Sequence, residues 1–296
     1  MPVVAIINRK GGSGKSTLAT HLAAYAANTG LVTMLGDIDR QHSSKTWLTL
    51  RKNLQDGSRP DILTWAVDVG GSLHPPHSAQ CVVLDTPGGL YGLELAKVVM
   101  VADVILMPVC NSIFDRESAA MCLVELKQLP KIKLGRCKLG VVGMRIDSRS
   151  HGANDVAAWA QTQGVEYIAH IRDTTIYVKC AERGLTIFDL LPSKVSFDVL
   201  QWQPILNWLK PLFDAASAFK HSQPTASAPS PLLKALDTQT LKSPGLGVAR
   251  DAHQPLAQRL TAPPYASQAL PSSAPLAAKK TLLESLGLPS FLTRKK

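Results

Sequence analysis

Glycines, a lysine and two hydroxyl side chains lie at a fixed spacing near the start of the chain, where residues 7–17 read INRKGGSGKST. The last three fixed positions of the phosphate-binding pattern G-x-x-x-x-G-K-[ST] are present. In that pattern the glycines let backbone N–H groups approach phosphate oxygens, the lysine contacts the β- and γ-phosphates, and the hydroxyl after it binds Mg²⁺. The residues that we predict to hold a nucleotide's phosphates are Gly11, Gly12, Ser13, Gly14, Lys15, Ser16 and Thr17.

The first glycine of the pattern is missing. Arg9 stands five residues before Gly14, where that glycine belongs, and a second lysine, Lys10, follows it. A triphosphate carries several negative charges, which one set of donors and one Mg²⁺ compensate only in part, so a second amine has a use there. The alternative is that Lys10 is a solvated side chain beside the loop.

A phosphate-binding loop has to lie between a strand and the N-terminus of a helix. Short apolar runs rich in β-branched residues predict strands at 3–8, 31–35, 81–85, 103–109 and 138–144. Helical patterns predict helices near 15–29, 44–55, 91–101, 114–129, 150–163, 175–183 and 196–218. Strands that are apolar on both faces and alternate with helices indicate an α/β fold with a doubly wound, mainly parallel sheet flanked by helices.

The composition changes near residue 221. Residues 221–296 carry nine of the 32 basic residues, three of the 22 acidic residues and ten of the twenty prolines. This basic segment, rich in Pro, Ala and Ser, has too little apolar surface to offset the entropy cost of ordering. We therefore predict a globular domain at 1–220 and a disordered tail at 221–296, with short apolar clusters at 231–241 and 279–293.

The pattern K-G-G-x-G-K-[ST] at residues 10–16 resembles the deviant Walker A loop of the ParA/MinD family of P-loop ATPases. The resemblance covers about residues 1–215 and is nearest to small ParA-type partition ATPases without an N-terminal DNA-binding domain. It includes PVCNSIFDRESA at 108–119, where a proline ends a strand in the family, and TTIYVKCAERGLTIFDL at 174–190. The resemblance implies ATP and Mg²⁺ as cofactors, hydrolysis of ATP to ADP and phosphate, and a homodimer when ATP is bound.

The resemblance also gives roles to individual residues. It implies that Lys10 crosses the dimer interface to the partner's nucleotide, so that Lys10, Lys15 and Asp39 are the catalytic set. DIDRQHSS at 37–44 resembles the element D-x-D-P-Q-x-S, with Arg40 in place of the usual proline. Asp39 would orient the attacking water, and Ser16, Asp37 and Asp85 would bind Mg²⁺ or its waters. The alternative for Asp37 and Asp39 is that they are ordinary carboxylates of a turn at the end of a strand.

A nucleobase contact is expected after the run at 138–144. The family often places Asn-Arg there, and this chain has Met144 and Arg145. The resemblance therefore carries over Arg145 alone as a nucleotide-binding residue, against the alternative that it is an ordinary exposed arginine at the end of a strand.

Partner predictions rest on the resemblance and on charge. ParA-like proteins bind DNA non-specifically and have a ParB-like or cargo adaptor that stimulates hydrolysis, whereas MinD-like proteins bind membrane through a C-terminal helix. Residues 127–138 hold five basic residues without an acid, which favours DNA, and the alternative is that this run is a solvated loop. The candidate DNA-binding residues are Lys131, Lys133, Arg136, Lys138, Arg149, Arg172, Lys179 and Arg183. The membrane alternative would use the tail.

The five cysteines include no C-x-x-C pair. This disfavours a metal-cluster carrier or reductase component that shares the loop, and it is typical of buried thiols in a reducing cytoplasm. The apolar stretch at 95–109 carries Lys97 and Asp103, which disfavours a membrane-spanning segment. We expect a bacterial, cytoplasmic, nucleoid-associated protein that positions or partitions a cargo.

Overall fold

The computed structural model describes residues 1–39, 41–54, 59–66 and 73–221. Arg40 and the predicted tail from residue 222 onward, including its apolar clusters at 231–241 and 279–293, lie outside the described residues. Within the described part of the chain, no helix is long and apolar enough to cross a bilayer. Four of the five cysteines are buried free thiols, and Cys110 is half-buried.

The strands form one seven-stranded sheet in the order β3-β2-β4-β1-β5-β6-β7. The strands are β1 (Val3–Ile6), β2 (Thr33–Asp37), β3 (Ile62–Ala66), β4 (Cys81–Asp85), β5 (Val104–Cys110), β6 (Lys138–Ile146) and β7 (Glu166–Arg172). Each pair of neighbours is parallel. The order runs outward in both directions from β1, which confirms the doubly wound α/β fold.

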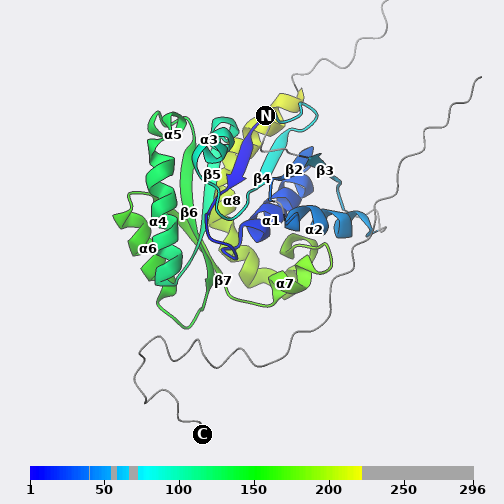
Figure 1. Cartoon of the computed structure of the whole chain (residues 1–296). Coiled ribbons are helices and arrows are strands. Elements are labelled where there is room, and N and C mark those ends of the chain that lie inside the picture. The colour runs from blue at the N-terminus through cyan, green and yellow to red at the C-terminus, as the bar shows by residue number, and fades with distance from the viewer. Residues whose placement is uncertain (40, 55–58, 67–72, 222–296) are drawn as a thin grey trace, which may run out of the picture. The chain divides into compact units, whose positions relative to one another are not determined.

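Helices cover both faces of the sheet (Figure 1). They are α1 (Lys15–Asn28), α2 (Ser43–Lys52), α3 (Gly92–Val101), α4 (Ile113–Gln128), α5 (Pro130–Lys133), α6 (Gly152–Thr162), α7 (Ile176–Ala181), the 3₁₀-helix η1 (Ile187–Asp189) and α8 (Pro192–His221). Side chains of α1, α2, α7 and α8 fill one hydrophobic core, and those of α3, α4 and α6 fill the other. The seven predicted helices are confirmed to within a few residues at each end.

Two strands were missed, and both lie at the edges of the sheet. β7 is only partly buried, and in β3 the buried Ile62 and Trp65 are separated by a half-buried and an exposed residue. An edge strand is covered less completely than a central one, so neither segment has a continuous apolar run to reveal it.

β5 runs through Pro108 and ends at Cys110, one residue beyond the predicted run at 103–109. The pairing of β5 with β1 ends at Leu106, so the missing N–H of Pro108 removes no hydrogen bond from that side of the ladder. Its carbonyl oxygen instead accepts a hydrogen bond from Nδ2 of Asn8, 2.6 Å away. This bond holds the start of the glycine loop against β5.

A buried histidine joins the first helix to the C-terminal elements. The Nδ1–H of His21 donates to the carbonyl oxygen of Thr17 at 2.8 Å, and its Nε2 accepts from the N–H of Ile187 at 3.3 Å. These partners require the neutral Nδ1–H tautomer. The ring also stacks on Trp202, with centroids 5.2 Å apart. Burial lowers the pKa of His21 to about 4.

The depressed pKa of His21 makes the fold sensitive to mild acid. The pKa of His21 is about 6.5 in the unfolded chain and about 4 in the folded one. The stability that the neutral ring contributes is therefore fully present above pH 6.5 and is lost as the pH falls towards 4. We expect the free energy of unfolding to fall by about 2 kcal/mol between about pH 7.5 and about pH 5 from this group alone. Denaturant titrations at both pH values should show a smaller fall for His21→Gln. The exposed control His77→Gln should keep the full fall, and an equal fall in all three proteins would contradict the assignment.

Candidate functional site

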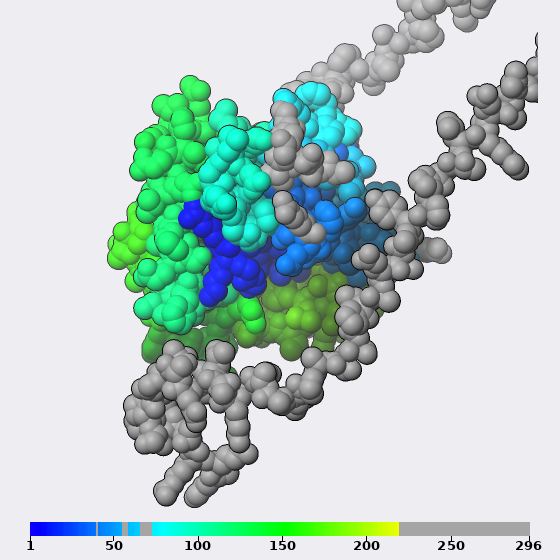
Figure 2. All heavy atoms as spheres, in the orientation of Figure 1, coloured from blue at the N-terminus to red at the C-terminus, as the bar shows by residue number. Residues whose placement is uncertain are grey.

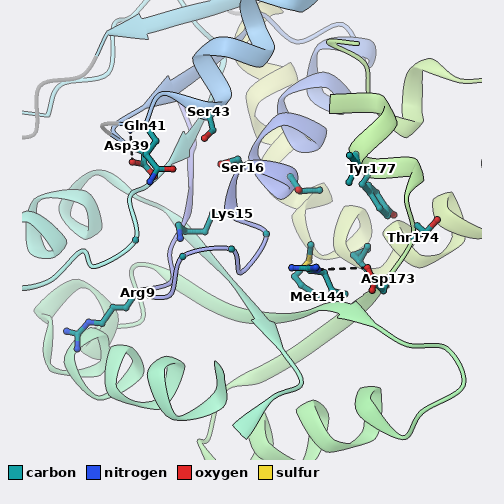
Figure 3. A pocket seen from close by; sticks show the side chains of 18 of the residues that line it. Arg9, Lys15, Ser16, Asp39, Gln41, Ser43, Met144, Asp173, Thr174 and Tyr177 are labelled. Atoms are coloured by element: carbon teal, nitrogen blue, oxygen red, sulfur yellow. Dashed lines mark hydrogen bonds and ion pairs between the residues drawn. The ribbon is translucent and has the colours of Figure 1, made fainter. Parts of the chain in front are cut away.

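A cavity of about 840 Å³ opens where the central strands end. One end of it is lined by the glycine loop and by Asp39, Gln41 and Ser43. The other end is lined by Met144 and Arg145, by residues 171–174, and by Tyr177 and Val178 of α7. Figure 3 shows these two groups of side chains facing one space from different elements. Because parallel strands end at the same edge, the loop after each strand contributes to this one site.

The glycine loop connects β1 to α1 and bends sharply at two residues. Gly12 and Gly14 have φ angles of 74° and 97°, which side chains with a Cβ atom rarely adopt. A Cβ atom on Gly14 would also lie 2.7 Å from Cε of Met144. α1 begins directly after Gly14 and has no side-chain cap. The N–H groups of its first turn therefore have no partner within the helix and can bind an anion.

Most of the Lys15 side chain is buried, and its Nζ donates a hydrogen bond to the carbonyl oxygen of Lys10 at 3.0 Å. Burial lowers the pKa of Lys15, although the nearby carboxylates of Asp85 and Asp39 act in the opposite direction. Ser16 and Thr17 line the cavity together with Lys15. Ser13, within the loop, is buried and does not line the cavity.

Asp85 lies at the end of β4, fully buried beside the loop, and burial raises the pKa of its carboxyl group to about 6. Hydrogen bonds from the hydroxyls of Ser44 and Ser16 counteract this shift. Ser44 donates to one carboxylate oxygen, Oδ2. The other, Oδ1, is buried and has no hydrogen-bond partner within the described structure. A buried oxygen of this kind needs a ligand, and a hard cation or its bound water fits it.

Asp37 ends β2 directly beside Asp85 in the sheet register. Its Oδ2 accepts from the N–H of Lys45 at 2.9 Å, and its Oδ1 accepts from the N–H of Asp39 at 3.0 Å. The described residues hold no group of three or more His, Cys, Asp or Glu side chains placed to bind a metal by themselves. A Mg²⁺ ion, which usually keeps waters and takes phosphate oxygens, matches a site with so few protein ligands.

Asp39 is half-buried and faces the cavity together with Gln41 (Figure 3). The N–H of Gln41 donates to Oδ1 of Asp39 at 3.0 Å. This bond orients the carboxylate and leaves its second oxygen available to a ligand or a water molecule.

Arg9 is among the residues that line the cavity, but the charged groups of Arg9 and Lys10 pair with carboxylates of α4. Nζ of Lys10 lies 2.7 Å from Oδ1 of Asp115 in the first turn of α4, and Arg9 pairs with Glu125 on the same helix. In Figure 3 Arg9 extends away from Lys15 and Ser16. The segment that carries both cations reaches the surface between α3 and α4 (Figure 2). The placement of Lys10 in a partner's site stays a prediction.

α2, whose first turn supports Asp85 and Asp37, is fixed at its other end by a buried ion pair. Arg51 makes two hydrogen bonds to Asp189, at 2.8 and 3.0 Å, and both side chains are at most 4% exposed. Sequence reasoning missed Arg51 and Ser44. Ser44 is the second serine of DIDRQHSS and could have been considered as a partner for a carboxylate, whereas nothing in the sequence connects Arg51 with Asp189.

Arg145 lines the far end of the cavity, and its backbone has a φ of 55°. Its guanidinium lies 3.9 Å from Asp173, and both side chains are more than half exposed. The N–H of Asp173 donates to the carbonyl oxygen of Ile146 at 2.9 Å, which holds the end of β7 against β6.

The predicted DNA-binding residues form two separate groups. Lys131, Lys133, Arg136 and Lys138 lie near the start of β6, and Arg149, Arg172, Lys179 and Arg183 follow the ends of β6 and β7. The nine residues of β6 separate the groups, a distance of about 26 Å.

One residue of the second group already has a partner inside the domain. The Arg172 guanidinium makes two hydrogen bonds to the buried Asp198, at 2.9 and 3.0 Å. These bonds raise the pKa of Arg172 and hold β7 to α8. Its geometry indicates a structural contact more than a free cation for a phosphate backbone.

Comparison with known proteins gives a consistent result. A family model described as the CobQ/CobB/MinD/ParA nucleotide binding domain matches residues 4–187. The maintenance of carboxysome distribution protein A of Gloeobacter kilaueensis is 32% identical over 192 residues, which cover 62% of this chain and 83% of that protein. The chromosome-partitioning ATPase Soj of Thermus thermophilus is 28% identical over 188 residues, covering 52% and 74%.

Solved structures show the same fold at low sequence identity. McdA of Cyanothece, in complex with ATP, is 17% identical and superposes with a TM-score of 0.54 over 76% of this chain and 98% of that one. MinD in the MinC:MinD cell division complex of Aquifex aeolicus is also 17% identical, with a TM-score of 0.51 over 77% and 99%. At this identity the likeness concerns the fold alone.

Proposed function

Because the chain belongs to the CobQ/CobB/MinD/ParA nucleotide-binding family, we propose that residues 1–220 form a Mg²⁺-dependent ATPase that dimerises with bound ATP and positions or partitions a cargo. The observation that carries the proposal is the buried carboxylate of Asp85, one oxygen of which has no hydrogen-bond partner among the described residues. This carboxylate lies near Ser16 and Lys15, where the glycine loop leads into α1. This is the arrangement that a nucleoside triphosphate with its metal ion requires.

The phosphate end of the cavity supports binding of the triphosphate. N–H groups at the start of α1 and the amine of Lys15 supply positive charge, and the glycines leave space for the phosphate oxygens. Ser16, Asp85 and Asp37 are the residues that would hold Mg²⁺ or its waters. When bound, Mg²⁺ compensates part of the charge on the phosphates.

Hydrolysis needs a water molecule held in line with the terminal phosphate. Asp39 is the carboxylate that faces the cavity, and its orientation is fixed by the N–H of Gln41. We assign Asp39 the role of orienting this water and accepting a hydrogen bond from it. Lys15 would stay on the phosphates and stabilise their charge.

For dimerisation, Lys10 has to leave the carboxylate of Asp115 and bind the triphosphate of the partner subunit. Its present partner is Asp115, in a pair that is 36% exposed on the lysine side. A partly exposed ion pair contributes about 1 kcal/mol or less. A triphosphate is the more highly charged anion, so a neighbouring subunit that presents ATP can take Lys10 away from Asp115 at small cost.

Relatives support cargo positioning as the outcome of the ATP cycle. The two relatives compared above bear names for carboxysome distribution and chromosome partitioning. For this chain we propose non-specific DNA binding on the nucleoid, in the cytoplasm, and an adaptor protein that stimulates hydrolysis. Lys179 and Arg183 are the better-placed cations, because α7 also lines the cavity through Tyr177 and Val178.

Lys10→Ala should keep nucleotide binding and lose ATP-dependent dimerisation, because the amine acts only across the interface. Light scattering with a non-hydrolysable ATP analogue measures the dimer, and calorimetry measures nucleotide affinity. Lys210→Ala, which breaks an exposed ion pair on α8, is the matched control and should dimerise normally. An unchanged dimer in the Lys10 variant would remove this residue from the mechanism.

Asp39→Ala should bind ATP and dimerise but turn over at least about a hundredfold more slowly, because the water is no longer oriented. Phosphate release measures turnover, and scattering shows whether the dimer persists after ATP is added. Normal turnover in this variant would assign hydrolysis to another residue.

DNA binding should need both ATP and Mg²⁺ and should weaken steeply with salt, because it rests on phosphate contacts. Fluorescence anisotropy with duplexes of unrelated sequence tests this. The double variant Lys179→Ala and Arg183→Ala should lose more ATP-dependent binding than Lys131→Ala and Lys133→Ala. ATP-loaded protein that ignores DNA and sediments with anionic liposomes would replace DNA with a membrane as the bound surface.

A further inference from the structure

The helices α2 and α7 line opposite ends of the nucleotide cavity. α2 begins at the phosphate end with Ser43, and α7 lines the other end with Tyr177 and Val178. Away from the cavity, the residues that follow α7 lie against α2 (Figure 1). We call residues 184–189, which include η1, the anchor segment. The two walls of the cavity are joined through this segment.

Gly184 brings the backbone of the anchor segment against the backbone of α2. Its φ is 65°, and a Cβ atom there would lie 2.7 Å from the carbonyl carbon of Leu50 and closer still to the N atom of Arg51. A side chain at this position would therefore displace α2 or the segment. The N–H groups of Gly184 and Leu185 donate to carbonyl oxygens in the last turn of α7. The anchor segment is thus itself fixed to α7.

Two side chains of α2 bind the anchor segment. The indole N–H of Trp47 donates to the carbonyl oxygen of Leu185 at 3.1 Å, and the guanidinium of Arg51 binds both carboxylate oxygens of Asp189. Both donors are buried, where a lost hydrogen bond is not replaced by water. Asp189 also accepts from the N–H and the hydroxyl of Thr186. The carboxylate that binds α2 is therefore held in place within its own segment.

The first turn of α2 holds the two carboxylates that we assign to the metal. The buried hydroxyl of Ser44 donates to Oδ2 of Asp85, and the N–H of Lys45 donates to Oδ2 of Asp37. α2 has ten residues and a length of about 15 Å, and a helix of this length moves as one body. A displacement of its last turn therefore also shifts the donors that hold Asp85 and Asp37.

We propose that the anchor segment positions the metal-binding carboxylates through α2, and that its contact with α2 sets the affinity of the site for Mg²⁺. The inference rests on the proposed function and adds residues that lie outside the cavity, since Trp47 and Gly184 do not line it. Groups that hold the ligands of a metal typically change its affinity by about tenfold to a hundredfold when they are removed. Ser44, Trp47 and Gly184 are therefore positioning residues.

Mn²⁺ binding to the complex of the protein with ADP tests the proposal without hydrolysis, because Mn²⁺ takes the same oxygen ligands as Mg²⁺. Electron paramagnetic resonance measures the free Mn²⁺, and calorimetry in EDTA measures the affinity for ADP without metal. We expect Ser44→Ala to weaken Mn²⁺ binding by at least about tenfold, and Gly184→Ala and Trp47→Phe by at least about threefold each. The affinity for metal-free ADP should change by less than about twofold in all three variants.

Two of these variants have a matched control. Gly135→Ala adds a Cβ atom at a nearly identical φ of 66°, but no atom lies within 4 Å of it. Trp208→Phe also removes an indole donor, whose acceptor is the exposed carboxylate of Glu166. Both controls should bind Mn²⁺ as the unmodified protein does. A loss caused only by backbone strain or by a smaller aromatic ring would appear in the controls too.

A double variant tests whether the anchor segment acts through α2. Because Ser44→Ala already disconnects α2 from Asp85, adding Gly184→Ala should weaken Mn²⁺ binding by less than it does alone. Fully additive losses, or a loss of metal-free ADP affinity as large as that of Mn²⁺ affinity, would overturn the proposal. Unchanged Mn²⁺ binding in Trp47→Phe would do the same, and this variant decides if Gly184→Ala does not fold. An unmodified protein that binds no Mn²⁺ with ADP would contradict the proposed function as well.

Discussion

The site depends on the burial of one carboxylate. Asp85 is removed from water at the end of β4, where the ionised form is costly, and its pKa rises to about 6. Two hydroxyls reduce that cost: Ser16 from the glycine loop and Ser44 from the start of α2. The hydrogen bond from Ser44 connects the start of α2 to the end of β4. The remaining oxygen, Oδ1, has no hydrogen-bond partner among the described residues, and we propose that it binds the cation that accompanies the phosphates.

α4 holds the two cations that distinguish this loop from the usual pattern. Asp115 and Glu125 pair with Lys10 and Arg9, and Glu125 also accepts a hydrogen bond from the N–H of Gly92 at the start of α3. Arg9 therefore has a structural partner where a glycine would have none. The loop is braced from its outer side by side chains and from its inner side by Asn8 and Lys15. These contacts hold the loop, with the positive φ angles of Gly12 and Gly14, in place before any ligand arrives.

Many of the residues at this site could be predicted, because their spacing in the sequence identifies them. The offsets of Gly14, Lys15 and Ser16, and the carboxylates that end apolar runs, follow from rules that need no tertiary contacts. The edge strands β3 and β7 were missed because partial burial erases the apolar run that marks a central strand. The pairing of Arg51 with Asp189 spans 138 positions of sequence, and no local pattern encodes such a contact. The basic residues were predicted as one set because sequence gives charge without showing which end of β6 it occupies.

The contact between Arg51 and Asp189 also bears on where the folding unit ends. Similarity to the family model stops at residue 187, yet Asp189 lies two positions further, and Trp202, Ile205 and Leu209 of α8 complete the core around α1. A fragment trimmed to the region of homology would leave a guanidinium without its counter-ion in the interior and an apolar face without its cover. The family match therefore ends before the core that α8 completes, and a fragment meant to keep that core has to include α8.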